Sequence, residues 1–314
     1  MKTTTFVITL IGSFLLTETI SAQTNADSIQ IKTDSLQIKS DSLYPDKHPP
    51  KTSHFEVALN YQNNEVYFGR KDSSVLHYYI PAFSYYHKSG LFATVSMNYL
   101  KNTTTSRVDL FTAQLGFVYT KSDYDGQLSV SKYFYNSQST SVTSEISASI
   151  ESQNSYDFDF IRVTFTGTLN IGSKMDFAGL FGLEHSFSFF KDHVNITPTF
   201  TATASTQNYY NDYYRKRRYT INRKGQTPQT GTASVSGTVF NAGAFRLLDY
   251  EPNLPINYTI GKCVFNFTPT YAIPVNPATV SVHTVRENGQ VFDHTKEETL
   301  SNTFYFTMGV TFSF

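Results

Sequence analysis

The chain has 314 residues, of which 16% are charged, with 25 basic and 25 acidic side chains in balance. This balance gives no signal for a polyanionic partner, so we expect no nucleic acid. A single cysteine, Cys263, excludes an internal disulfide framework and a multi-cysteine metal site. A mean hydropathy of -0.30 excludes a helical membrane protein.

The N-terminus has the three parts of an export signal. Met1 and Lys2 open a weakly positive region, Phe6 to Leu16 is an apolar run, and a polar region ends in "ISA" at Ala22. The apolar run is too short to cross a bilayer as a helix. Residues 1–22 are therefore predicted to be a signal peptide, and we expect the mature chain to leave the cytoplasm.

Residues 23–53 are predicted to be a flexible tether. Three seven-residue units, "DSIQIKT", "DSLQIKS" and "DSLYPDK", fill residues 27–47, and a Pro-rich stretch closes the segment. A seven-residue period suggests a coiled coil, but the apolar residues recur at spacing two within each unit, and three short units are too few for a helical seam. The polar, repetitive composition favours a solvated linker.

From residue 54 onward the sequence predicts one strand after another. Thr, Tyr, Phe and Val dominate, and apolar residues alternate with small or hydroxylic ones at period two. The twelve predicted strands are Phe55–Asn63, Leu76–Tyr86, Leu91–Lys101, Ser106–Thr120, Gly126–Tyr135, Ser141–Ser152, Phe158–Ile171, Lys174–Phe190, Val194–Thr206, Phe245–Ile260, Lys262–Val275 and Thr299–Phe314.

One residue interrupts this alternation. In the fifth predicted strand, Lys132 falls on the same face as Leu128, Val130 and Phe134. A single exception does not overturn a pattern that the other strands share.

The connections between the strands sort by length. Turns on the side of the N-terminal tether are short ("HKSG", "KSDYDG", "SQNSYD", "FKDH" and "GK"), whereas the other side carries residues 207–244 and 276–298. A soluble sandwich has no reason to sort its loops this way, but a membrane barrel has short turns on one side and long loops on the other. The predicted fold is all-β: a transmembrane, antiparallel, up-and-down β-barrel of about twelve strands, spanning residues 54–314.

The last predicted strand ends in "FYFTMGVTFSF", residues 304–314, with every second residue apolar. This segment resembles the C-terminal targeting signal of Gram-negative outer-membrane β-barrel proteins, an alternating strand with a terminal aromatic residue. The resemblance implies that Val310, Phe312 and Phe314 are recognised by the barrel-assembly machinery during insertion. It also implies a cell outer membrane protein in contact with lipid and lipopolysaccharide, with a periplasmic tether. We expect a monomer, and the resemblance identifies no functional family.

Several charged residues fall on faces that the alternation turns inward. They are Glu56, Glu145, Glu151, Arg162, Lys174, Asp176 and Glu184. Charges facing a lumen need a partner or water. They could line a narrow aqueous path, or they could form ion pairs that fill a small barrel, because twelve strands lie between a filled barrel and a wide channel.

The longest loop contains a basic, tyrosine-rich stretch, "NYYNDYYRKRRYTINRK", at residues 208–224. Clustered guanidinium groups and rings suit phosphate or sugar-phosphate ligands. The simpler interpretation is that they neutralise headgroup phosphates on an anionic outer surface. The candidate residues for an anionic ligand are Arg215, Lys216, Arg217, Arg218, Arg223 and Lys224.

The last long loop predicts a hairpin that projects from the barrel. Pro269 and Pro274 each remove a backbone donor, so they should mark irregular positions or the end of the membrane-spanning strand. Beyond them, two alternating runs flank Asn288 and Gly289, a pair that favours a tight turn.

No motif indicates an enzyme, a cofactor or a metal. The chain lacks a zinc-protease helix motif, a nucleophile elbow and a phosphate loop. The outer-membrane phospholipase resembles this chain in strand count only, and His185, the nearest equivalent of its outward histidine, has no identifiable partner serine. We therefore predict no catalytic residue, no cofactor and no metal ligand.

Two functions remain open from the sequence. The first is a small pore for polar solutes, which the inward charges favour. The second is a non-conducting surface or scaffold barrel that binds lipopolysaccharide or a partner through its long loops, which the decorated loop favours.

Overall fold

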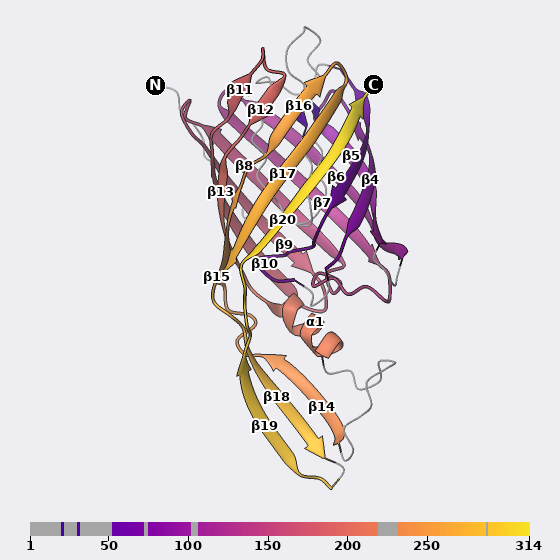
Figure 1. Cartoon of the computed structure of the whole chain (residues 1–314), viewed down its shortest axis with the longest axis vertical. Coiled ribbons are helices and arrows are strands. Elements are labelled where there is room, and N and C mark those ends of the chain that lie inside the picture. The colour runs from indigo at the N-terminus through magenta and orange to yellow at the C-terminus, as the bar shows by residue number, and fades with distance from the viewer. Residues whose placement is uncertain are drawn as a thin grey trace.

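The computed structural model describes residues 20–21, 30–31, 52–71, 75–101, 106–218, 232–286 and 288–314. Most of the predicted signal peptide and tether lie outside these ranges, as do Arg223 and Lys224 of the basic stretch. Near the N-terminus, the short strands β1 (Ile20–Ser21) and β2 (Gln30–Ile31) pair antiparallel. The remaining strands form a barrel and a small attached sheet (Figure 1).

Twelve antiparallel strands close into the barrel, and neighbours in sequence are neighbours in space. The predicted fold class is confirmed. Three of the twelve wall strands are interrupted by a short break, so each of these three consists of two consecutive strand segments. The bounds are β3 (His54–Gln62), β4 (Tyr78–Tyr86), β5 (Leu91–Lys101), β6 (Ser106–Lys121), β7 (Tyr124–Tyr135), β8 (Ala148–Asp157), β9 (Arg162–Ile171), β10 (Met175–Glu184) with β11 (Phe187–Phe189), β12 (Val194–Ile196) with β13 (Thr199–Ser205), β15 (Arg246–Asn253) with β16 (Ile256–Ile260), β17 (Cys263–Pro274) and β20 (Thr303–Ser313).

The seam of the barrel joins its first and last strands. β20 pairs with β17 on one side and with β3 on the other, with Val310 opposite Leu59. At the end of the seam, the backbone N–H of Phe55 donates to the Phe314 carbonyl and that of Phe314 donates to the Phe55 carbonyl, both at 3.0 Å. Closure leaves no unpaired strand edge in the wall, which is what a bilayer requires of a β-structure.

The alternation of the sequence becomes an apolar outside and a polar inside. On β9, Thr164, Thr166 and Thr168 are fully buried on the inward face. On β6, Leu115 points outward and is 66% exposed. Exposed apolar side chains of this kind surround the whole barrel, a distribution that suits lipid and would be unstable in water.

The two ends of the barrel differ, as the loop lengths predict. One end, here the turn end, carries the short turns together with the beginning of β3 and the end of β20 (Figure 1). The opposite end, here the loop end, carries the longer connections, of which the structure describes residues 63–71, 75–77, 136–147, 206–218, 232–245, 275–286 and 288–302.

The sixth strand is shorter than predicted. β8 begins at Ala148, not at Ser141, because residues 142–145 form a turn that folds toward the barrel axis. Val142 and Ile146 are buried there with side chains from other loops, so they do not continue the wall.

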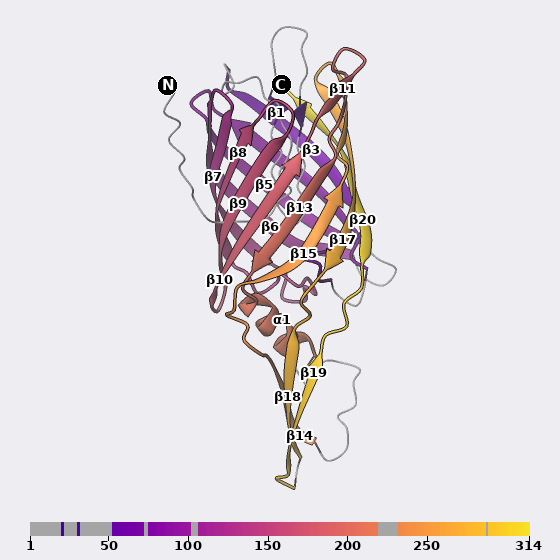
Figure 2. The same ribbon diagram turned by 90° about the vertical axis from the view of Figure 1, so that its left-hand side faces the viewer.

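The predicted projecting hairpin is confirmed, and it has a third strand. β18 (Thr279–Arg286) and β19 (Val291–Glu297) pair antiparallel, and β14 (Thr232–Val239), from the longest loop, pairs with β18. Gly289 adopts a φ of 79° in the tight turn between β18 and β19, a value that favours glycine. Figure 2 shows this projecting sheet beyond the loop end, with helix α1 (Asn208–Arg218) between it and the barrel.

Candidate functional site

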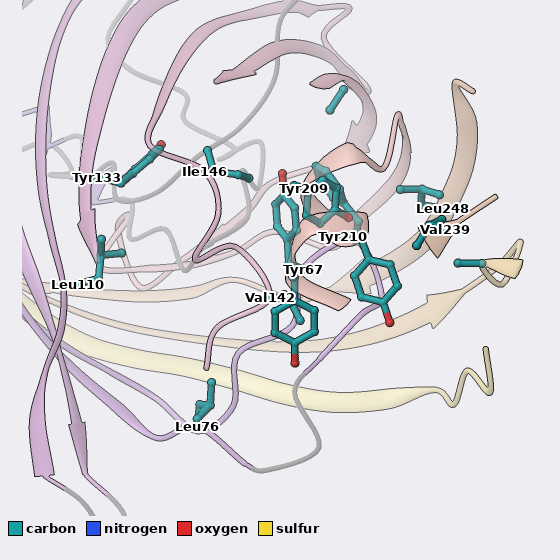
Figure 3. Packing of buried hydrophobic residues seen from close by; sticks show 14 of the residues in the cluster. Tyr67, Leu76, Leu110, Tyr133, Val142, Ile146, Tyr209, Tyr210, Val239 and Leu248 are labelled. Carbon is teal, nitrogen blue, oxygen red and sulfur yellow. The ribbon is translucent and has the colours of Figure 1, made fainter. Parts of the chain in front are cut away.

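The loop end of the barrel contains a cluster of buried aromatic and aliphatic side chains, here called the plug (Figure 3). Its members come from the loop segments 63–71, 75–77 and 136–147, from helix α1, from the adjoining ends of the wall strands and from the base of the projecting sheet. They include Tyr67, Phe68, Leu76, Tyr133, Val142, Ile146, Tyr209, Tyr210, Tyr213, Val239 and Leu248.

The first segment of the plug crosses the lumen. It leaves β3, the first strand of the barrel, and the hydroxyl of its Tyr67 accepts a hydrogen bond from Asn170 Nδ2 at 3.1 Å. Asn170 lies on β9, which is the seventh strand and therefore faces β3 across the barrel. The Tyr67 ring stacks on Phe68 at 3.8 Å between centroids and meets the edge of Tyr209 at 5.1 Å. This segment therefore links opposite walls of the barrel.

A buried carboxylate ties the second segment to the first. Glu65 is 1% exposed and accepts hydrogen bonds from the hydroxyls of Ser141 and Thr143, the latter at 3.3 Å. A carboxylate taken out of water needs such donors to compensate its lost hydration. Residues 136–147 are thereby held inside the barrel mouth.

Helix α1 is fixed to the wall through its N-terminus. The Asp176 carboxylate, on β10, accepts hydrogen bonds from the backbone N–H groups of Asn208 and Tyr209 at 2.7 Å each and from the Thr206 hydroxyl at 2.5 Å. The first turn of the helix contains no acidic residue of its own. Asp176 therefore supplies both the missing acceptors and the negative charge that a helix N-terminus favours.

Arg70 joins the plug to the base of the projecting sheet. Its Nε lies 3.3 Å from Glu298 Oε2, its Nη2 donates to the Asn276 carbonyl at 3.3 Å, and its guanidinium lies 5.2 Å from the centroid of the Tyr210 ring. The Tyr210 hydroxyl also donates to Glu298, at 2.5 Å. Burial and the neighbouring Glu298 carboxylate raise the pKa of Tyr210, so its hydroxyl remains a neutral donor to that carboxylate.

The residue next to Arg70 shows how tightly this segment is packed. Gly69 adopts a φ of 72°, and a Cβ placed on it would lie 2.5 Å from Pro274 Cβ. Only glycine combines this backbone conformation with such a close approach to β17.

Five of the seven predicted inward charges are buried on the lumen side of the wall. Arg162 forms ion pairs with Asp125 at 2.8 Å and with Glu184 at 3.4 Å, and the Glu56 carboxylate lies 2.9 Å from His54 Nε2. Glu151 is 4% exposed on β8, and Asp176 caps helix α1.

The other two inward candidates lie outside the strands. Glu145 is in the turn that precedes β8, and Lys174 is exposed in the turn between β9 and β10. The predicted inward positions of Glu145 and Lys174 are therefore wrong, because β8 and β10 begin only after these residues.

The remaining candidate residues divide between the helix and the last strand. Arg215, Lys216, Arg217 and Arg218 form the C-terminal part of α1, of which the structure describes the backbone. On β20, Val310 and Phe312 point outward, and the Phe314 ring stacks against Phe55 with centroids 6.2 Å apart.

The described residues contain no arrangement that indicates catalysis. His185 Nδ1 donates a hydrogen bond to the Phe160 carbonyl at 2.7 Å, and the His185 ring packs edge-on against Phe187. Within the described ranges, no group of three or more His, Cys, Asp or Glu side chains could hold a metal ion. No helix in the same ranges is long and apolar enough to span a membrane.

Sequence reasoning missed Arg70, Glu65 and Glu298, although the first long loop carries a signal. Its sequence "NNEVYFGRK" places three consecutive apolar residues, Val66 to Phe68, in a segment that a solvated loop would fill with polar ones. All three are buried.

No protein-family model matches the chain, and no curated protein matches it in sequence. Among solved structures it is similar to CdiB from Acinetobacter baumannii (TM-score 0.37, 6% identity, 91% of this chain and 61% of that chain covered). It is also similar to a bacterial polysaccharide outer membrane secretin (TM-score 0.36) and to a porin (TM-score 0.30). In both cases the identity is 9%, and the match covers 84% of this chain and 99% of the other chain. At these identities and TM-scores, the likenesses carry no argument about what the chain does.

Proposed function

We propose that the chain is an outer-membrane β-barrel held closed at its outer end, and that it acts as a non-conducting surface barrel. The observation that carries this proposal is the Tyr67–Asn170 hydrogen bond, which joins segment 63–71 to the wall opposite its origin. A segment that spans the lumen and is packed on both sides obstructs the path that a solute would take.

The closed end also presents a surface for binding. Helix α1 lies at the loop end and the projecting sheet lies beyond it, and Arg70 contacts both Tyr210 of the helix and Glu298 at the base of the sheet (Figure 2). The basic residues Arg215 to Arg218 form the C-terminal part of this helix. Contact with lipopolysaccharide or a phosphorylated glycan through this region suits their charge.

A pore for polar solutes is the second candidate, favoured by the lining of the wall. The inward faces of β9 and β13 carry rows of threonine hydroxyls, including Thr164, Thr166, Thr201 and Thr203. Such a lining suits water and small polar solutes.

Single-channel recording in planar bilayers separates the two candidates. The wild-type protein should show no conductance steps. Arg70→Ala removes the buried cation that holds Glu298, so it should loosen the plug and produce intermittent steps. Arg246→Ala is the matched control, because Arg246 is an exposed arginine at the same end of the barrel. Stable, open-channel steps from the wild type would overturn the proposal in favour of the pore.

A further inference from the structure

Lys132 lies where the wall faces lipid. It points outward from β7 between Val130 and Phe134, and its side chain is exposed. Within the described wall strands, no other lysine or arginine stands at an outward position with outward apolar residues on both sides along its strand. A cation on this surface costs free energy unless it reaches the headgroup region or meets an anion.

The surroundings of Lys132 leave its ammonium group accessible. Its direct neighbours on the adjacent strands are Ala113 on β6 and Ala148 on β8, which are the smallest outward side chains of those strands. Lys132 Nζ lies 5.9 Å from the centroid of the Phe134 ring, so the side chain extends toward the loop end. No carboxylate of the described residues forms an ion pair with it.

The position along the strand sets the depth of this cation. Lys132 is three residues from Tyr135, the last residue of β7 at the loop end. At about 3.3 Å per residue, the backbone lies roughly 10 Å along the strand from that end, within reach of the membrane interface for a lysine side chain.

We propose that Lys132, in the gap between Ala113 and Ala148, binds the phosphate of a lipid headgroup in the leaflet at the loop end. The acyl chains of that lipid would lie along the outward apolar residues of β6 and β7, such as Leu115 and Val130. The proposal rests on the membrane orientation of the proposed function, with the loop end outside. It concerns the wall, and it does not involve the basic stretch of the longest loop.

The test measures binding of bisphosphorylated lipid A to the full chain, folded in detergent, by native mass spectrometry. Lys132→Ala should weaken this binding about fivefold, the effect expected of one cation beside an anionic headgroup. Lys132→Arg should retain it, because the charge and its reach are kept. Lys121→Ala is the matched control: Lys121 is an exposed lysine at the turn-end terminus of β6, so its loss should leave the affinity unchanged.

Dephosphorylated lipid A and inorganic phosphate complete the design. Dephosphorylated lipid A should bind the wild type and Lys132→Ala equally, and inorganic phosphate should not compete, because the site also requires the acyl chains. Equal affinity of the wild type and Lys132→Ala for the phosphorylated lipid would overturn the site. A conducting wild type would instead overturn the non-conducting function and leave the lipid affinity unaffected, so the two failures are distinguishable.

Discussion

The wall and the plug turn their apolar side chains in opposite directions, outward from the barrel and inward into its mouth. On β6, Leu115 and Phe117 face outward and are exposed, while Gln114, the residue before Leu115, is buried. In the plug, Tyr67 and Phe68 point inward and are buried against α1 and the far wall. The wall therefore has lipid as its apolar environment and the plug has other side chains. The same residue types stabilise two regions through two different surroundings.

The largest effect is expected where the wall closes. Replacing Phe312 and Phe314 together with Asp puts two charges on the lipid face of the seam and removes the terminal alternation. The protein should be lost from the outer membrane, measured by fractionation. Phe292→Asp is the control, because Phe292 is exposed on the projecting sheet outside the barrel. Normal membrane abundance of the double variant would contradict both the outward assignment and the predicted assembly signal.

A second prediction concerns the inside of the wall. Arg162→Ala leaves the carboxylates of Asp125 and Glu184 without the cation between them, so we expect a loss of about 3–5 kcal/mol in the free energy of unfolding. Arg286→Ala, on the projecting sheet, removes a guanidinium that lies 4.4 Å from the centroid of the exposed Phe292 ring. It should cost far less. Urea unfolding, followed by the gel shift of the folded barrel, measures the loss of unfolding free energy in each variant. Equal losses in Arg162→Ala and Arg286→Ala would contradict the distinction between the barrel wall and the projecting sheet.

A third prediction compares two exposed apolar residues directly. Leu115 is 66% exposed on the wall and Val291 is 53% exposed on the projecting sheet. Leu115→Arg should cost about 2–4 kcal/mol in a bilayer, because the charge then lies on the lipid face near mid-strand. Val291→Arg should be nearly neutral, because β19 lies beyond the barrel. Unfolding in lipid vesicles tests this, and a tolerated Leu115→Arg would place that face in water.

The sequence predicts the wall well because the wall obeys a local rule. A strand of period two assigns each residue to a face without reference to any distant residue, which is why Glu56 and Arg162 lie on the inward side. The rule fails where the backbone leaves the ladder. The alternation predicts inward positions for Glu145 and Lys174, but β8 and β10 begin after these residues.

The plug could not be predicted in the same way, because its contacts join residues far apart in sequence. Tyr67 and Asn170 are 103 residues apart, and Arg70 and Asn276 are 206 apart. Helix α1 had a partial signal in the spacing of its buried Tyr209, Tyr210 and Tyr213, which lie on one side of a helical turn. A tyrosine-rich, basic stretch in a long loop nevertheless gives no indication that its rings pack inside a barrel mouth.

The smallest predicted effect lies where the wall and the plug meet. Asp176 belongs to β10 by its backbone and to α1 by its hydrogen bonds, so its replacement should loosen the helix without opening the wall. Asp176→Ala removes the acceptors at the helix N-terminus, which should cost about 0.5–2 kcal/mol, as the loss of a helix cap does. Asp176→Asn keeps one oxygen acceptor and should cost less. Hydrogen exchange measured by mass spectrometry should then be fastest in residues 208–213 of Asp176→Ala, slower in Asp176→Asn and slowest in the wild type. Exchange in β9 should be the same in all three. If β9 and the helix lost protection together, the wall and the plug would unfold as one unit, and the distinction drawn between them would not hold.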